Sequence, residues 1–133
     1  MDAKHEGNVL VVDDDRNAVD ILNRLLTKEG FVVQCAHGGR EAVTIATANP
    51  IDVILLDVMM PEMDGHEVLQ RMRDDPRTRD VPVIFVTAMS DAVDEQRGLA
   101  LGAVDYITKP ISPATALARV RTHVALSERT AML

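Results

Sequence analysis

The chain has very few aromatic residues, and this scarcity restricts the kind of core that it can build. Its 133 residues include no Trp, one Tyr and two Phe, whereas hydrophobic residues make up 47% of the sequence. A chain of this length is large enough for one domain with a sizeable core. We therefore expect a single folded domain whose core is built mainly from aliphatic side chains.

Cysteine, long apolar runs and an excess of positive charge are missing as well. Cys35 is the only cysteine, so the chain can form no internal disulfide, and we expect an inert, buried thiol in a reducing cytoplasm. No apolar run has the length of a membrane span, and the first residues do not resemble a secretory signal. The net charge of -7 argues against direct binding to nucleic acid or to an anionic membrane.

The sequence does contain a regular alternation of β-rich runs and helical patterns. Short runs rich in Val, Ile and Leu predict strands at residues 9–13, 31–36, 52–57, 82–87 and 104–108. The segments between the runs repeat apolar residues at helical spacing. This pattern predicts an α/β fold of the (βα)5 type, with a doubly wound parallel sheet, helices on both faces and the flavodoxin-like strand order 2-1-3-4-5.

The expected helices also carry start and stop signals. Asp15, Asp64 and Ser112 are placed to cap the starts of the first, third and fifth helices. Gly30 and Gly102 are placed to end the first and fourth helices. These signals support the alternation that the apolar pattern predicts.

Polar residues stand at the carboxyl ends of four of the five expected strands. Asp13 and Asp14 end the first strand, Asp57 ends the third, Thr87 ends the fourth and Lys109 follows the fifth. In open parallel sheets the ligand crevice lies outside these strand ends, so we expect the five side chains to converge. Close carboxylates repel one another unless a cation joins them, and an all-oxygen cluster favours Mg²⁺ or Mn²⁺.

This set of side chains fits the transfer of a phosphoryl group. A bound metal and the Lys109 ammonium can neutralise phosphoryl oxygens, and the Thr87 hydroxyl can donate a hydrogen bond to one of them. Asp57 is then the nucleophile, which forms an aspartyl phosphate.

Four segments together resemble the receiver domain of two-component response regulators, in the CheY-like superfamily. They are VVDD at 11–14, LDVMMPEMDG at 56–65, VTA at 86–88 and DYITKP at 105–110. The resemblance covers roughly residues 8–127. It implies that a sensor histidine kinase or phosphotransfer protein phosphorylates Asp57. It also implies that Asp14, Asp57 and the Met59 backbone carbonyl hold the metal, with Asp13 acting through water.

The same resemblance assigns roles to the end of the fourth strand and to the fifth strand. Lys109 contacts the phosphoryl group and precedes a cis peptide bond, while Thr87 and Tyr106 form a switch pair. Phosphorylation is expected to draw Thr87 forward, turn Tyr106 inward and remodel the face of the fourth helix, fifth strand and fifth helix. That face would act on an output domain or effector, and a homodimer through it is compatible with the sequence.

The expected chemistry is limited to this phosphoryl group, so we do not expect a further enzymatic activity. Self-catalysed transfer to Asp57 should be followed by slow hydrolysis. Met59 and Met89 stand where family members often carry polar residues that speed hydrolysis, and thioethers orient water poorly. The expected domain boundaries are 1–127 for the receiver domain, with its core at about 8–127, and 128–133 for a C-terminal tail that would begin a linker.

Three alternatives use the same fold or chemistry. A phosphohydrolase of the haloacid dehalogenase type also uses an Asp nucleophile, but it needs a second Asp where Met59 stands, as well as a cap domain. A flavodoxin-like cofactor binder needs a first loop rich in Gly, Ser and Thr, whereas the acids at 13–15 would repel a phosphate without a metal. An interaction module that works without phosphorylation stays open.

Overall fold

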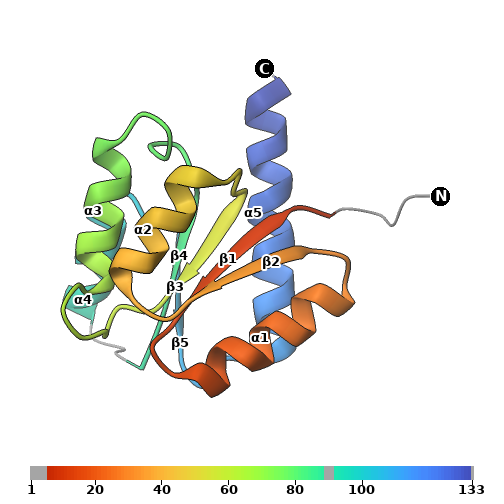
Figure 1. Cartoon of the computed structure of the whole chain (residues 1–133), viewed down its shortest axis with the longest axis horizontal. Helices are drawn as coiled ribbons and strands as arrows, with labels where there is room; N and C mark the ends of the chain where they lie inside the picture. The colour runs from red at the N-terminus through yellow and green to blue at the C-terminus, as the bar shows by residue number, and fades with distance from the viewer. Residues whose placement is uncertain (1–5, 89–91, 133) are drawn as a thin grey trace.

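The computed structural model describes residues 6–88 and 92–132, and the side chains of 6–88 and 95–127. Within these residues strands and helices alternate as the sequence predicts (Figure 1). In chain order the elements are β1 (Asn8–Val12), α1 (Arg16–Lys28), β2 (Val32–Ala36), α2 (Gly39–Ala48), β3 (Val53–Leu56), α3 (Gly65–Asp74), β4 (Val83–Thr87), α4 (Ala92–Ala100), β5 (Asp105–Thr108) and α5 (Pro113–Met132).

All five strands are parallel and lie in the order β2-β1-β3-β4-β5, which confirms the predicted doubly wound sheet. The register aligns the carboxyl ends of the central strands, because Val12 of β1 is paired with Leu56 of β3. Thr87 of β4 is paired with Thr108 of β5. The residues that follow these strands therefore emerge side by side at one edge of the sheet.

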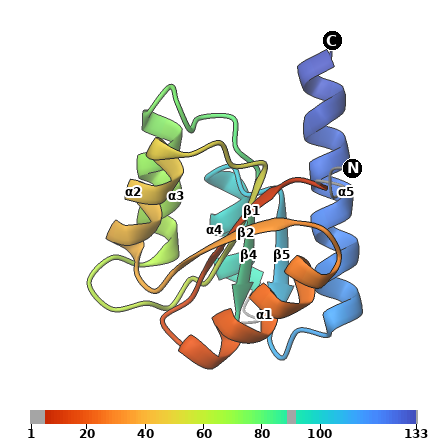
Figure 2. The ribbon, with the colours of Figure 1, turned by 45° about the vertical axis from the view of Figure 1, so that its right-hand side comes forward.

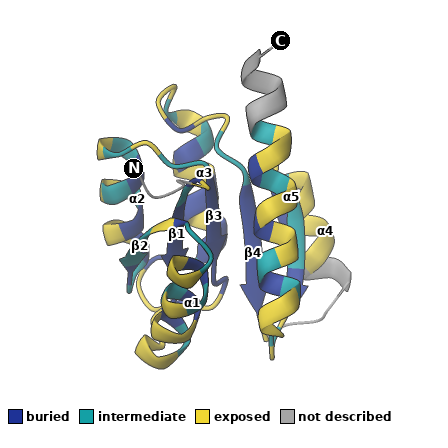
Figure 3. Cartoon of the chain, turned by 90° about the vertical axis from the view of Figure 1, so that its right-hand side faces the viewer, coloured by how far each residue is buried: buried dark blue, intermediate teal, exposed yellow. Residues whose placement is uncertain are grey.

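Helices cover both faces of the sheet. Helices α1 and α5 lie on one face, and α2, α3 and α4 lie on the other (Figures 1 and 2). Alternate residues of each strand supply the two cores; Leu10 packs with α2 and α3, whereas Val9 and Val11 pack with α1 and α5. The central strands are buried on both sides, as Figure 3 shows, which explains their nearly continuous apolar sequence.

Several expected helix boundaries are confirmed by their hydrogen bonds and backbone angles. Asp15 and Asp64 each accept a hydrogen bond at 2.9 Å from a backbone N–H of the first turn. Ser112 caps α5 in the same way, at 3.0 Å. Gly30 and Gly102 follow α1 and α4 with positive φ angles of 99° and 105°, where glycine is favoured.

The edge strand corrects one expectation. Cys35 lies on β2 and is half-buried, so the prediction of a buried thiol is wrong; β2 has a neighbouring strand on one side only. Partial burial, with smaller contributions from Asp20 and Glu41, raises the pKa of the Cys35 thiol above its ordinary value.

Helix α5 continues to Met132, so that residues 128–132, expected as a tail, extend the last helix of the domain. In Figure 1 its C-terminal end reaches beyond the sheet. Within residues 6–88 and 92–132, no helix combines the length and the apolar character that a membrane span requires.

Candidate functional site

The carboxyl ends of β1 and β3 bring the three predicted acids together. Asp13 and Asp57 each follow the paired residues Val12 and Leu56, and the Asp57 backbone N–H donates a 2.9 Å hydrogen bond to the Val12 carbonyl. Asp14 is the next residue in the chain. One carboxylate oxygen from each of the three acids lies within 4.8 Å of the others. Asp13 and Asp57 are buried, whereas Asp14 is exposed, so the cluster opens to solvent on one side.

Lys109 reaches this cluster from the end of β5. Its Nζ lies 2.7 Å from Oδ2 of Asp13 and 3.8 Å from Oδ2 of Asp57. Its backbone N–H donates a 2.7 Å hydrogen bond to the carbonyl of Thr87, which fixes the position of Lys109 beside the end of β4. The Lys109–Pro110 peptide bond is cis, as the family resemblance implied.

The charges of the cluster act on one another. Burial of the carboxyl and repulsion from Asp13 together raise the pKa of Asp57 to about 7. The Lys109 charge and the hydrogen bond from the Met59 backbone N–H oppose this rise. Burial lowers the pKa of Lys109, but the hydrogen bond to Asp13 and the charges of Asp57 and nearby acids outweigh it and raise the pKa above its ordinary value. Lys109 is therefore a stable cation, whereas Asp57 needs a further positive charge to be fully ionised at pH 7.

The donor set of the cluster fits a small, hard cation such as Mg²⁺. Ligands on opposite sides of an octahedral Mg²⁺ are separated by roughly 4.2 Å, since each bond is about 2.1 Å long. The acid oxygens lie within 4.8 Å of one another, so small side-chain rotations are enough to bring them to this separation. In Asp13, Oδ1 accepts a hydrogen bond from the Asp15 backbone N–H at 3.0 Å, and Oδ2 accepts one from Lys109. Both oxygens already have a donor, which favours contact with a metal through water.

The loop between β3 and α3 packs tightly against Asp57. The Gly65 backbone N–H donates a 2.9 Å hydrogen bond to the Val58 carbonyl. A Cβ on Gly65 would lie 2.6 Å from the Asp57 carbonyl oxygen, so this close approach requires glycine. Met59 follows in the same loop, two residues after Asp57, with 59% of its surface exposed. Met89, its expected counterpart, lies outside the described residues.

The expected switch residues lie on neighbouring strands. Thr87 is fully buried at the end of β4, and Tyr106 is half-buried on β5. Tyr106 is paired with Phe85, two residues before Thr87, and strand alternation places Phe85 and Thr87 on the same face of the sheet. Phe85 has no predicted role, because its only signal in the sequence is its place within an apolar strand.

Comparison with known proteins identifies the family. A family model described as the response regulator receiver domain matches residues 9–121. The chain belongs to this family. Family membership favours a receiver domain over a dehalogenase-type hydrolase or a flavodoxin-like cofactor binder.

Solved receiver structures share the fold of this chain. The chemotaxis protein CheY4 of Vibrio cholerae is 32% identical with a TM-score of 0.83, over 87% of this chain and 97% of that chain. A CheY-like receiver domain protein from Methanospirillum hungatei is 26% identical with a TM-score of 0.88, over 93% and 98% of the two chains. The predicted five-stranded fold is thus confirmed.

The curated relatives are longer proteins. Response regulator PleD of Caulobacter vibrioides is 45% identical over 114 residues, which are 86% of this chain and 25% of PleD. The probable transcriptional regulator ycf27 of Cyanidium caldarium is 44% identical over 119 residues, or 90% and 47% of the two chains. A probable cyclic di-GMP phosphodiesterase of Vibrio cholerae is 39% identical over 124 residues, or 93% and 28%. The chain therefore spans about a quarter to a half of the length of these relatives.

Proposed function

We propose that this receiver domain accepts a phosphoryl group on Asp57 from a histidine kinase or a phosphotransfer protein. The observation that carries the proposal is the cluster itself, in which oxygens of Asp13, Asp14 and Asp57 lie within 4.8 Å of one another. The Lys109 ammonium lies 3.8 Å from the acceptor carboxylate. Phosphoryl transfer depends mainly on such positioning and charge neutralisation.

Each residue has a defined part in the transfer. An Asp57 oxygen attacks phosphorus, and the new P–O bond forms as the bond between phosphorus and the donor nitrogen breaks, with its electron pair left on the donor. Mg²⁺, or Mn²⁺, held by Asp14, Asp57 and the Met59 carbonyl, with Asp13 acting through water, would supply positive charge to carboxylate and phosphoryl oxygens. The Lys109 ammonium also neutralises the charge of the phosphoryl oxygens, and the Thr87 hydroxyl donates a hydrogen bond to one of these oxygens.

The switch then acts on the α4-β5-α5 face. Movement of Thr87 toward the phosphoryl group vacates space into which Tyr106 turns, and the half-buried position of Tyr106 supports this role. Leu99 of α4 and Val104 before β5 are 44% and 43% exposed, so this face offers apolar surface to an effector, an output domain or a second copy.

The proposed boundaries remain 1–127 for the receiver and 128–133 for the beginning of a linker. The unbroken course of α5 to Met132 supports a helical connection, and the greater length of the curated relatives supports an output domain beyond it. Self-catalysed transfer and slow hydrolysis are the only chemistry that we assign to the domain. We place it in the cytoplasm, which suits its single, unpaired Cys35.

Intact-mass measurement after incubation with acetyl phosphate tests the proposal. We expect a gain of one phosphoryl group with Mg²⁺, no gain with EDTA, and no gain in Asp57→Asn. Glu95→Gln, which removes one acidic charge from an exposed position on α4, is the control and should behave as the wild type. Absence of any gain in folded protein that binds Mg²⁺ would favour an interaction module that works without phosphorylation.

The coupling of the switch has a separate test. Thr87→Ala should retain part of its phosphoryl uptake but should weaken the dependence of the α4-β5-α5 face on phosphorylation. Hydrogen exchange of peptides from β5 and α5, compared with and without acetyl phosphate, measures this dependence. If the exchange pattern of Thr87→Ala responded as fully as that of the wild type, Thr87 would not be part of the switch.

A further inference from the structure

Three rings form a line of contacts on one face of the sheet. His66, at the start of α3, is 5% exposed, and Phe85 of β4 is fully buried. Their ring centroids lie 5.2 Å apart at an interplanar angle of 71°. Phe85 and Tyr106 lie 6.3 Å apart at 73°. Both pairs have the edge-to-face geometry that aromatic rings favour, so Phe85 is the middle member of a specific arrangement.

The first end of this line is joined to the phosphoryl acceptor. His66 directly follows Gly65, whose backbone packs so closely on Asp57 that a Cβ would lie 2.6 Å from the Asp57 carbonyl oxygen. The hydrogen bond from Gly65 to Val58 ties the same backbone to the loop after β3. A displacement of the acceptor loop must therefore move the first turn of α3, and the His66 ring with it, because closely packed atoms cannot move independently of one another.

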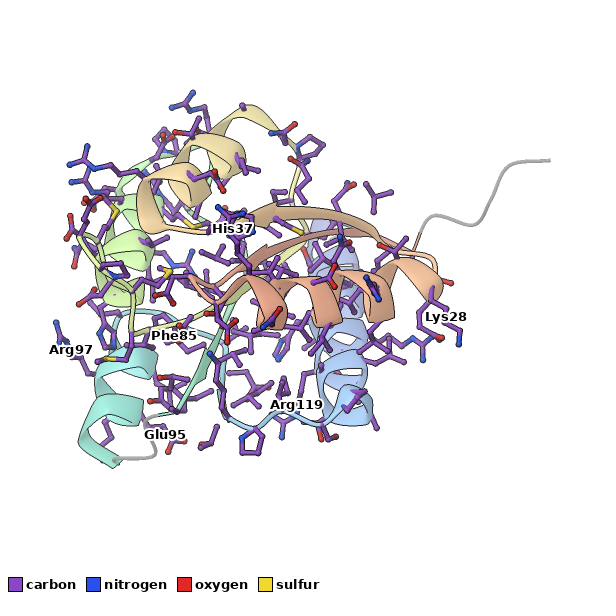
Figure 4. The ribbon with its side chains drawn as sticks, turned by 60° about the horizontal axis from the view of Figure 1, so that its bottom comes forward. Lys28, His37, Phe85, Glu95, Arg97 and Arg119 are labelled. Carbon is purple, nitrogen blue, oxygen red and sulfur yellow. The ribbon has the colours of Figure 1, made fainter. Side chains whose placement is uncertain are left out.

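The other end of the line reaches α4 as well as Tyr106. A Cβ on Gly98 would lie 2.8 Å from two carbons of the Phe85 ring and 3.7 Å from Cδ2 of Tyr106. Helix α4 thus rests directly on the ring, because Gly98 lacks a side chain at this point. In Figure 4 Phe85 lies between the ribbons of α3 and α4, while Glu95 and Arg97 are labelled on α4 itself.

We propose that Phe85 is a positioning residue that links the acceptor loop, through His66, to Tyr106 and α4, in parallel with the route through Thr87. The inference rests on the proposed phosphorylation of Asp57. A line of contacts transmits a signal only if it biases an element that has two states, and the half-buried Tyr106 side chain is that element. Phosphorylation shifts the loop, the His66 ring shifts the Phe85 ring, and the space available to Tyr106 and α4 changes.

The composition of the chain provides a specific probe. Tyr106 is the only tyrosine and the chain has no tryptophan, so tyrosine fluorescence reports on this side chain alone. The experiment measures the change in fluorescence when acetyl phosphate is added with Mg²⁺. Intact mass gives the phosphorylated fraction of the same sample, and the fluorescence change is divided by that fraction.

Phe85→Leu is the test variant and Phe31→Leu is its matched control. Phe31 is the only other phenylalanine and is 4% exposed, but it packs in the core on the opposite face, with α1 and α5. We expect both variants to take up the phosphoryl group. We expect Phe85→Leu to lose most of the tyrosine response, whereas Phe31→Leu keeps it. If Phe85→Leu does not fold, His66→Leu breaks the same line at its first contact and should show the same loss.

Two further outcomes separate the inference from the proposed function. Absence of phosphoryl uptake by the wild type would overturn the proposed function. If phosphoryl uptake is normal and Phe85→Leu keeps the full tyrosine fluorescence response, the proposed role of Phe85 is wrong, although the proposed function stands. The same conclusion follows if uptake is normal but the wild type shows no tyrosine fluorescence response. If the two routes are parallel, Thr87→Ala keeps a residual response that disappears in the double variant with Phe85→Leu. A double variant that responds as Thr87→Ala alone does would contradict the second route.

Discussion

Replacing Asp57, the proposed phosphoryl acceptor, by its neutral isostere Asn should stabilise the metal-free domain. Burial and repulsion by Asp13 raise the pKa of Asp57 from 3.8 to about 7. Between these two values the folded protein keeps a proton that the unfolded chain releases. The free energy of unfolding of the metal-free wild type should therefore fall as the pH rises from about 4 to about 7. At higher pH it should stay at this lower value.

The size of the effect follows from the shift. Each pKa unit corresponds to about 1.4 kcal/mol, so a rise from 3.8 to about 7 costs at most roughly 4 kcal/mol above pH 7. The amide that Asp57→Asn introduces has one acceptor oxygen where the carboxylate has two, which reduces the expected gain to about 1–3 kcal/mol. For a domain of this size the gain corresponds to an increase in Tm of roughly 3–10 °C.

Thermal unfolding of both proteins in EDTA at pH 5 and pH 8 measures this effect. The gain should be large at pH 8 and small at pH 5, where Asp57 is protonated in the folded wild type. Saturating Mg²⁺ should shrink or reverse the gain, because the metal stabilises the wild type by binding its folded state. Glu95→Gln controls for the change in net charge. A gain that is equal at both pH values would refute the assignment of the raised pKa to this carboxyl, and a gain that Mg²⁺ leaves unchanged would contradict metal binding through Asp57.

Three further predictions concern the same site. Lys109→Gln should slow phosphoryl uptake from acetyl phosphate by about 10²–10³-fold and retain Mg²⁺ binding; an unchanged mass time course would exclude Lys109 from the transfer. Gly65→Ala should lower the free energy of unfolding by about 1–3 kcal/mol in urea titrations, because its Cβ would lie 2.6 Å from the Asp57 carbonyl oxygen. Gly38→Ala, whose Cβ would meet nothing within 4 Å, is the matched control and should have little effect. The phosphorylated protein should decay slowly and Met59→Asn should speed the decay, as intact mass over time would show; rapid loss from the wild type would contradict this.

The sequence predicted the fold because its strongest physical signal is burial. Strands β1, β3 and β4 are covered on both faces, so nearly every residue in them is apolar, and their runs stand out against the amphipathic helices. Alternation then leaves few topologies, since parallel crossovers are right-handed. The convergence of Asp13, Asp57 and Lys109 followed from the topology alone, because parallel strands end at the same edge.

The sequence could not predict contacts that depend on side-chain packing between distant elements. Phe85 is one apolar residue among several in β4, and only the approach of α3 and α4 distinguishes it from its neighbours. Gly98 lies inside α4, where no turn requires a glycine. Its role follows only from the structure, in which a Cβ at this position would clash with the Phe85 ring. Cys35 differs from these two residues, because the predicted strand order 2-1-3-4-5 already places it on an edge strand, and its partial burial follows from that order.

The charge balance of the site indicates how the proposed phosphorylation would act on the proposed switch. Among the described residues, three carboxylates face the Lys109 ammonium, which lies closer to Asp13, at 2.7 Å, than to Asp57, at 3.8 Å. Phosphorylation replaces the single charge of Asp57 by roughly -1.5 to -2 on the phosphoryl oxygens, which should draw the ammonium away from Asp13. The Lys109 N–H is bonded to the Thr87 carbonyl at 2.7 Å, so the ends of β4 and β5 are coupled to this movement through the backbone. In the proposed mechanism Lys109 would therefore sense the new charge directly, while Thr87 and Phe85 would carry its consequence to Tyr106 and α4.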